Sequence, residues 1–379
     1  NIMKKKILIC GIKMNMGGTE KALLSFLETI DREKYNIDLV LAESGGALAG
    51  QLPSDIQILK PIKNGSLFSL SKRNVFKTIR QLDFPQKKKF LFNHIHFFIT
   101  APFSCYMYQK LWILLMKQAI LPFDREFEIN TEYDICLAFW GDRTMFYMSE
   151  KVNAKQKIAW LHFDYFHPKR DDRIYRYYFD RCTAVISVSR SCTKLLKEHF
   201  PELESKFFTL LNSLPEKEIL CSSEKNTEFP DQKYTGLRLL SVMRICRQKG
   251  YFLIPNVLYL LKQENIKARW YIAGTGSKKD TMKLCRKAKR LGVSDMLILL
   301  GHVDNPYPYI KKCDIFILPS KYEGMPITVE EAKLLRKPIV CTNYLSATEQ
   351  LDNGRYGEIC SYSAKSIFLA VKKIISHTL

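Results

Sequence analysis

The stretch Lys321-Tyr-Glu-Gly-Met-Pro-Ile-Thr-Val-Glu-Glu-Ala332 decides the fold of this chain. It lies between two apolar runs, residues 314–320 and residues 338–342. Pro326 lacks the backbone N–H that a helix interior requires, so a helix between the two runs is expected to start at or just after this residue. The order strand, loop, helix, strand is typical of an α/β fold with a parallel sheet.

Two carboxylates flank the expected start of this helix, Glu323 in the loop and Glu331 on the first turns. The free N–H groups of a helix N-terminus attract anions. Acidic side chains beside such a site suit a ligand that carries hydroxyl groups as well as phosphate, and a nucleotide-sugar is such a ligand. Glu331 would accept a hydrogen bond from the ribose and Glu323 from a hexose. The alternative is two solvated glutamates, which helix N-termini favour in any case.

A pair of cations follows another apolar run, residues 237–243. Arg244 and Lys249 are expected on the loop at the carboxyl end of that strand, before Gly250 and an apolar helical stretch at 251–261. An arginine fork and a lysine point charge can converge on a diphosphate. The alternative is a pair of surface cations in a cation-rich chain, but the strand before them and the glycine and helix after them favour the diphosphate.

The N-terminal half shows the same alternation of strands and helices. Residues 6–10 are typical of a buried parallel strand, and Gly17-Gly18 follow before a helical stretch. This order predicts the first unit of a doubly wound sheet, in which the glycines let the backbone approach a ligand. The motif is not GxGxxG, so NAD is not predicted. His162 ends the strand expected at 157–162, on the sheet edge where ligands bind; the alternative is a core histidine bonded to a carbonyl.

The spacing of Glu323 and Glu331, with Arg244, Lys249 and Gly250, resembles the signature of retaining nucleotide-sugar glycosyltransferases of family four (glycosyl transferases group one). The resemblance implies the GT-B fold, which is two Rossmann-like α/β domains facing each other across a cleft. The expected domains are residues 1–220 for the acceptor and 221–360 for the nucleotide-sugar donor, with a boundary in a polar linker near 217–232. A helix within 361–379 would pack back on the N-terminal domain.

The resemblance also implies roles for single residues. The implied catalytic residues are His162, Arg244, Lys249 and Glu323, and the implied donor-binding residues are Gly17, Gly18, Val303, Gly324, Met325, Ile327, Thr328 and Glu331. The enzyme would move a hexose from a nucleoside-diphosphate sugar, with UDP as the expected nucleotide, by same-face attack that retains the anomeric configuration. We expect no metal and no other cofactor, because the chain lacks an Asp-x-Asp motif and two cations already supply charge. Met325-Pro326 and Thr19 depart from residues frequent in the family.

A net charge of +21 suggests an anionic partner. Basic and aromatic residues gather in an insertion at about 60–125, which is too interrupted for the roughly twenty apolar residues of a spanning helix. The pattern suits helices in a membrane interface; the alternative is an insertion that packs on its own domain. Nucleic acid is not an expected partner, because no helix-turn-helix, RRM or finger signature appears. We expect a cytoplasmic enzyme, peripheral on the inner face of the cell membrane, that uses a glycan or lipid-linked acceptor in bacterial cell-surface polysaccharide synthesis.

Two other functions use the same residues. A GT-B-fold sugar-nucleotide epimerase would bind the diphosphate in the same way, and a non-catalytic module would bind a nucleotide-sugar without turnover. The eleven cysteines form no CxxC pair and several sit in apolar runs, so reduced core cysteines are expected. No signal peptide is expected, because the apolar run after Lys4-Lys-Lys6 is short.

Overall fold

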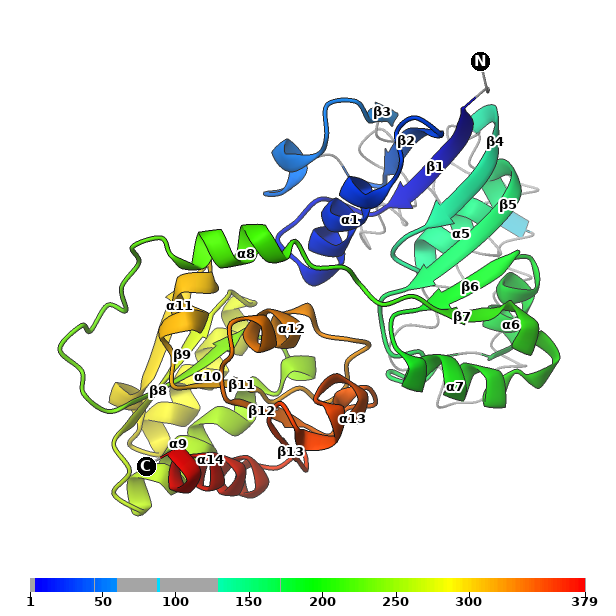
Figure 1. Ribbon diagram of the computed structural model, residues 1–379. Coiled ribbons are helices and arrows are strands. Elements are labelled where there is room, and N and C mark those ends of the chain that lie inside the picture. Colours follow the sequence, from blue (N-terminus) through cyan, green and yellow to red (C-terminus); the bar gives the residue numbers. More distant parts are fainter. Residues whose placement is uncertain (1–3, 44, 60–86, 89–128, 171, 379) are drawn as a thin grey trace. The chain divides into compact units, whose positions relative to one another are not determined.

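The computed structural model describes residues 4–43, 45–59, 87–88, 129–170 and 172–378. The chain forms two compact units, Asn1–Ser213 and Leu214–Leu379, called here the N-terminal and the C-terminal domain (Figure 1). The insertion expected at 60–125 lies outside the described residues except for residues 87–88, so its contact with a membrane stays a prediction.

The N-terminal domain is built on a seven-stranded parallel sheet in the order β3-β2-β1-β4-β5-β6-β7. The strands are β1 Lys5–Gly11, β2 Tyr35–Leu41, β3 Gln57–Leu59, β4 Ile129–Ala138, β5 Val152–Leu161, β6 Ala184–Ser187 and β7 Phe207–Thr209. The described helices are α1 Gly18–Thr29, α5 Asp142–Lys151, α6 Asp172–Asp180 and α7 Arg190–His199, with short 3₁₀ turns at η1 Ala49–Gln51 and η7 Pro201–Lys206. The strand runs predicted from sequence are therefore confirmed.

Strand β1 lies inside the sheet, between β2 and β4, which explains its apolar sequence. Its residues from Ile7 to Cys10 are buried, because both of their neighbours are strands and helices cover the sheet.

Ser189 caps helix α7, since its Oγ accepts a hydrogen bond from the Cys192 N–H at 3.1 Å. Serine is one of the residue types that favour this position.

The C-terminal domain is built on a six-stranded parallel sheet in the order β10-β9-β8-β11-β12-β13. The strands are β8 Leu237–Val242, β9 Ala268–Ala273, β10 Leu297–Gly301, β11 Ile315–Leu318, β12 Ile339–Thr342 and β13 Glu358–Cys360. The helices are α8 Glu216–Ser223, α9 Ile254–Gln263, α10 Lys278–Arg290, α11 Tyr307–Lys312, α12 Ile327–Leu334, α13 Ala347–Gln350 and α14 Ala364–Thr378. Short 3₁₀ turns are η8 Arg247–Lys249, η9 Tyr251–Leu253, η10 Ser294–Met296 and η11 Asp352–Gly354.

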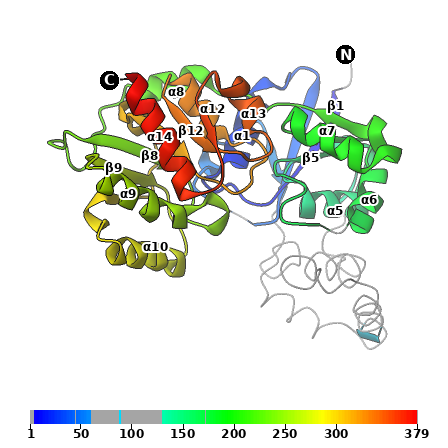
Figure 2. The ribbon, with the colours of Figure 1, turned by 90° about the horizontal axis from the view of Figure 1, so that it is seen from below.

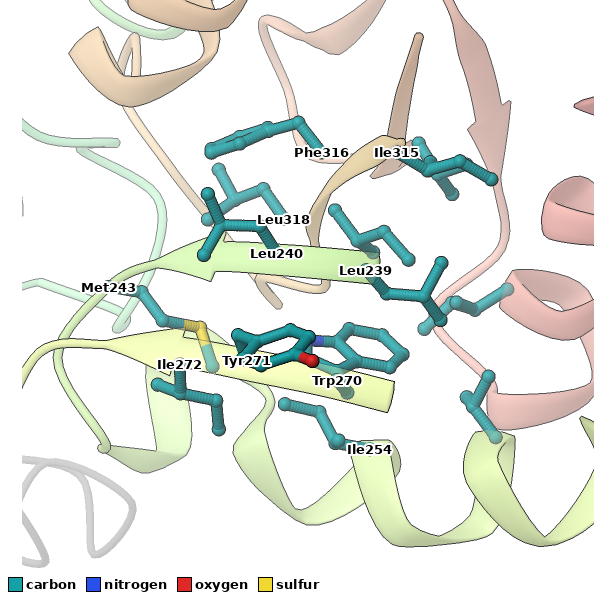
Figure 3. Packing of buried hydrophobic residues seen from close by; sticks show 14 of the residues in the cluster. Leu239, Leu240, Met243, Ile254, Trp270, Tyr271, Ile272, Ile315, Phe316 and Leu318 are labelled. Carbon is teal, nitrogen blue, oxygen red and sulfur yellow. The ribbon is translucent and has the colours of Figure 1, made fainter. Parts of the chain in front are cut away.

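The core of this domain lies where helix α9 covers the middle of the sheet. Figure 3 shows Leu239 and Leu240 of β8 beside Trp270 and Tyr271 of β9, with Ile254 of α9 below them. All five side chains are fully buried. Apolar residues thus occur on both faces of these strands, which explains their continuous rather than alternating hydrophobic pattern.

The strand order reverses between β8 and β11, which are neighbours in the sheet but far apart in sequence. Leu240 of β8 pairs with Phe316 of β11 in parallel register. The loops after these two strands therefore leave the same sheet edge side by side. In open α/β sheets this switch point is where ligands bind.

Two segments differ from the sequence-based expectation. The stretch predicted as a linker near 217–232 contains helix α8, which packs on α11, and its Ile219 and Phe229 are buried in the C-terminal core. The linker prediction is wrong there, because two apolar side chains are enough to anchor a polar segment. The described domain boundary, at Ser213 and Leu214, also lies before residue 221.

Helix α14 packs on α9, β12 and β13 of its own domain. Its residues Ile367 and Val371 are fully buried there. The apolar face of the helix is thus used by the C-terminal domain, and the expected packing on the N-terminal domain stays a prediction.

Candidate functional site

The loops after β8 and β11 contact each other through a glycine. Gly250 has a left-handed φ of +68°, and a Cβ at this position would lie 1.8 Å from the carbonyl oxygen of Pro319. Only glycine fits, because any side chain would clash with backbone as well as adopt a strained φ. Two hydrogen bonds join the same loops: the Lys321 N–H donates to the Gln248 carbonyl at 2.7 Å, and Gln248 Nε2 donates to the Tyr322 carbonyl at 3.1 Å.

This contact brings Lys249 to Glu323. The Lys249 Nζ donates to Glu323 Oε1 at 2.6 Å, and the two side chains are only 16% and 9% exposed. A lysine ammonium has three N–H donors, so Glu323 occupies one and two more can serve other acceptors. The pair therefore offers an anchored positive charge beside a carboxylate, which is what a phosphate with a neighbouring hydroxyl requires.

Arg244 lies on the same loop, just after β8, and its side chain is exposed. The loop after β9 packs against the backbone just before Arg244. A Cβ at Gly274, which has a φ of +143°, would lie 2.0 Å from the Met243 carbonyl oxygen. The Ile245 N–H also donates to the Thr275 carbonyl at 2.8 Å. Within the described part of the chain, no carboxylate lies within 4 Å of Arg244. Its guanidinium is thus available to an anion from outside the domain.

Helix α12 begins at Ile327, directly after Pro326, as predicted from the sequence. Its start is held by Gln350, whose Nε2 donates to the Pro326 carbonyl at 2.9 Å. The Tyr344 hydroxyl in turn donates to Gln350 Oε1 at 2.6 Å. The first-turn N–H groups of Ile327 and Thr328 therefore have a fixed direction at the same sheet edge, and they add a partial positive charge.

The two glutamates are not solvated, so that alternative from the sequence is wrong. Glu331 is 1% exposed and Glu323 is 7% exposed. The Tyr307 hydroxyl donates to Glu331 Oε1 at 3.3 Å, across the contact between α11 and α12. A carboxylate buried beside a hydroxyl donor has a fixed position, which suits an acceptor for a ligand hydroxyl.

The remaining expected donor-binding residues of this domain lie at the same edge. Gly324 is buried and Met325 is half-buried in the loop before α12, and Val303 is half-buried in the loop before α11. Loops after β10 and β11 thus frame the N-terminus of α12. Their contact with a nucleotide stays a prediction.

His162 of the N-terminal domain follows β5 directly, as predicted. Its ring lies 4.4 Å from the Phe139 ring and 5.3 Å from the Trp160 ring, measured between centroids. Burial lowers the pKa of His162 to about 3, so the imidazole is neutral at pH 7. Neither ring nitrogen has a hydrogen-bond partner among the described residues, so the alternative of a histidine bonded to a carbonyl is not seen there.

Gly17 and Gly18 lie at the N-terminus of helix α1, after β1, as the sequence predicted. Gly17 has an extended backbone, with φ of −153° and ψ of 163°, which any residue can adopt. Backbone strain does not require a glycine there, but a Cβ at this position would clash with the Glu20 carboxylate. The approach of a ligand to this glycine stays a prediction.

Sequence reasoning missed the residues that hold the site from behind. Tyr307 donates a hydrogen bond to Glu331, and Gln350 donates one to the Pro326 carbonyl at the start of α12. Tyr344 acts one step further away, because its hydroxyl donates to Gln350. Tyr307 has a weak sequence signal, because it starts a helix after a predicted strand and the Asn305-Pro306 turn. Gln350 has none, because it belongs to a helix of four residues with no periodic pattern.

Two kinds of feature are absent from the described residues. They contain no group of three or more His, Cys, Asp or Glu side chains placed to hold a metal ion. No helix within the described ranges is both long and apolar enough to cross a membrane.

Residues 223–378 match the family described as Glycosyl transferases group 1. The C-terminal domain belongs to the group 1 glycosyltransferases. An uncharacterized glycosyltransferase of Methanocaldococcus jannaschii is 23% identical over 45% of this chain and 42% of its own length. An uncharacterized glycosyltransferase of Haemophilus influenzae is 25% identical over 71% of this chain and 74% of its own length. A Campylobacter jejuni N-acetylgalactosaminyltransferase is 31% identical over 30% of each chain. The aligned stretch thus spans less than half the length of several glycosyltransferase relatives.

Solved structures extend the likeness to both domains of this chain. HepE of Anabaena in complex with UDP has a TM-score of 0.65 and 14% identity, covering 99% of this chain and 91% of HepE. WaaG, a glycosyltransferase of lipopolysaccharide biosynthesis, has a TM-score of 0.58 and 14% identity over 98% and 91%. At this identity the likeness shows the fold, which is GT-B. The expected cleft between the two domains stays a prediction.

Proposed function

We propose that the chain is a retaining, metal-independent glycosyltransferase that moves a hexose from a nucleoside-diphosphate sugar, with UDP as the nucleotide. The observation that supports this most is the Lys249–Glu323 ion pair of 2.6 Å at the switch point between β8 and β11. It sets a cation and a hydroxyl acceptor side by side, beside Arg244 and the N-terminus of α12. HepE, which has the same fold, was solved with UDP and with UDP-glucose.

The reaction needs positive charge where the leaving group departs. The acceptor hydroxyl oxygen forms a bond to the anomeric carbon on the face from which the diphosphate leaves, and the hydroxyl proton passes to the departing phosphate oxygen. As the glycosidic C–O bond breaks, negative charge grows on the diphosphate. Arg244, Lys249 and the Ile327 and Thr328 N–H groups would stabilise it, and loss of one preorganised donor costs about 3–4 kcal/mol of transition-state stabilisation.

The carboxylates and the histidine would orient the donor. Glu323 would accept a hydrogen bond from a hexose hydroxyl and Glu331 from the ribose. His162 would contact the sugar near the anomeric carbon as a neutral imidazole, because burial keeps its pKa far below 7. A neutral ring can accept or donate a hydrogen bond without repelling the cation-like sugar of the transition state.

The acceptor is proposed from chemistry and from relatives. One relative is named as acting on a diphospho-undecaprenol-linked sugar and another as an O-antigen biosynthesis glycosyltransferase. We therefore propose a glycan or lipid-linked acceptor in cell-surface polysaccharide synthesis, with the enzyme in the cytoplasm and peripheral on the membrane through residues 60–125. Flotation with anionic liposomes at low salt tests the membrane contact: the protein should float with the vesicles, and failure to do so would contradict it.

Nucleotide-sugar turnover tests the proposed reaction. A panel of UDP- and GDP-hexoses is incubated with the full chain, and release of the nucleoside diphosphate and thermal stabilisation are measured. We expect one donor to be hydrolysed slowly by the wild type and not by Lys249→Ala. Lys312→Ala is the control, because Lys312 lies on α11 outside the proposed site and pairs with Glu228. No stabilisation by any donor, or equal hydrolysis by Lys249→Ala, would contradict the proposal.

A further inference from the structure

The C-terminal domain has a second cationic hollow, which we call the α10 pocket. It has a volume of about 740 Å³ and lies among η8, η9, helix α10 and the loops after β11 and β13. Figure 2 shows α10 beside α9. The pocket is lined by six cations: Arg247, Lys283, Arg286, Lys287, Arg290 and Lys321.

Four of these cations form one stripe on α10. Lys283, Arg286, Lys287 and Arg290 are spaced i, i+3, i+4 and i+7, so their side chains share one helix face. Like charges at this spacing destabilise a helix. Burial lowers the pKa of Lys287, and the nearby Arg290 lowers it further. An anion between these side chains would remove the repulsion.

The lining cations lack the carboxylate partners that other cations of this domain have. Among the described residues, none of the six lies within 4 Å of a carboxylate oxygen. Lys372, by contrast, pairs with Glu264 at 2.9 Å. Asp280 acts on Lys283 and Arg247 electrostatically, but its oxygens accept hydrogen bonds from the Tyr251 hydroxyl at 2.9 Å and the Ser277 hydroxyl at 2.7 Å.

The simpler explanation is that cations near a helix C-terminus offset the helix dipole. It accounts for Lys287 and Arg290, which lie in the last turn of α10. It does not account for Arg247 or Lys321, which also line the pocket but belong to the loops after β8 and β11. Cations from three separate segments therefore converge on one hollow.

An apolar wall completes the pocket. The Phe252 and Tyr362 rings both line it and pack edge to face, with centroids 6.2 Å apart. The Lys287 Nζ donates to the Phe252 carbonyl at 2.8 Å, which fixes the stripe against this wall. Volumes of about 300–1,000 Å³, with aromatic walls and a few charged groups, are typical of ligand sites.

The α10 pocket is separate from the proposed donor site. Arg244, Lys249 and Glu323 do not line it. Helix α10 packs with α9, whereas the donor site involves the packed pair α11 and α12. Since the crossover connections of a parallel sheet are right-handed, the reversal of strand order after β10 puts these two helix pairs on opposite faces.

We propose that the α10 pocket binds a phosphate-bearing ligand at a site additional to that of the donor diphosphate. Arginine forks and lysine ammoniums from three segments match the several acceptor oxygens of phosphate groups. The Phe252–Tyr362 wall would cover the uncharged part of the ligand. The same chemistry could come from a soluble phosphate compound or from a phosphate head group at a membrane surface.

Calorimetric titration with pyrophosphate tests this site. The full chain with Arg244→Ala and Lys249→Ala is the starting protein, so that the donor site does not contribute. Adding Lys283→Glu and Arg290→Glu should weaken pyrophosphate binding about tenfold or more, as loss of two charge-assisted contacts predicts. The matched control adds Lys279→Glu and Lys289→Glu, which change the charge of the same helix equally outside the pocket, and should change affinity less than about twofold. Circular dichroism confirms that both variants are folded.

Equal weakening in both variants would show only a general charge effect and would overturn the proposal. A parallel sedimentation assay uses vesicles of phosphatidic acid and phosphatidylcholine with the same variants. If vesicle binding alone depends on Lys283 and Arg290, the ligand is a lipid head group; if pyrophosphate binding also depends on them, soluble phosphate compounds bind as well. No dependence in either assay overturns the proposal.

Discussion

Removing one partner of the Lys249–Glu323 ion pair should destabilise the C-terminal domain by more than half as much as removing both partners. The Nζ and Oε1 atoms are 2.6 Å apart, and the side chains are 16% and 9% exposed. Losing one partner of a fully buried pair costs about 3–5 kcal/mol, because the other charge remains buried. Partial exposure lowers this cost, so we expect about 2.5 kcal/mol for Lys249→Met and about the same for Glu323→Gln. The double variant should lose about 3 kcal/mol, which leaves a coupling energy of about 2 kcal/mol.

Hydrogen exchange read by mass spectrometry suits this cycle, because a chain of two domains need not unfold in one step. Amides of the C-terminal core around Leu239 and Trp270 report the opening free energy of that domain alone. Amides around Val185 of the N-terminal domain are the internal control and should not change. A coupling energy below about 0.5 kcal/mol would show that the two charges do not depend on each other, and the reasoning from burial would be refuted.

Three further changes test other parts of the structure. Gly250→Ala should destabilise the C-terminal domain by more than the roughly 1–2 kcal/mol of left-handed strain, and it should weaken UDP binding. Gly292→Ala is the control and should show the strain alone, because Gly292 has a similar φ of +64° and only Lys262 Nζ lies within 4 Å of the added Cβ. Equal losses of stability in urea melts would contradict the loop contact. Between pH 6.5 and pH 5 the wild-type protein should lose about 1.6 kcal/mol more stability than His162→Phe. The reason is that the unfolded histidine binds a proton that the folded ring, with its pKa lowered to about 3, does not bind. Identical pH profiles of unfolding would contradict this. Arg244→Ala should lower sugar transfer about 100-fold or more without changing the melting temperature, since the side chain is exposed, and transfer near the wild-type rate would remove Arg244 from the mechanism.

The sequence was sufficient where a feature depends on neighbouring residues. Pro326 predicted the start of α12, and the apolar run at residues 6–10 predicted a buried parallel strand. Each depends on backbone chemistry within one turn or one strand. For the same reason Arg244 and Lys249 could be placed on the loop after β8.

The sequence was insufficient where strand order brings distant segments together. Lys249 and Glu323 are 74 positions apart and meet only because β8 and β11 are neighbours in the sheet. Tyr307 reaches Glu331 through the packing of α11 on α12, and neither residue predicts the other. Helix α8 was missed because a single buried isoleucine in a polar segment gives no hydrophobic period.

The position of bound UDP is the most direct test of the central claim, that cations at the carboxyl ends of β8 and β11 hold a nucleoside diphosphate. A crystal structure of the full chain grown with UDP should show the diphosphate within hydrogen-bond distance of Arg244, Lys249 and the first N–H groups of α12. UDP bound only elsewhere, for example in the α10 pocket, would contradict the claim, as would crystals that bind no nucleotide at a saturating concentration.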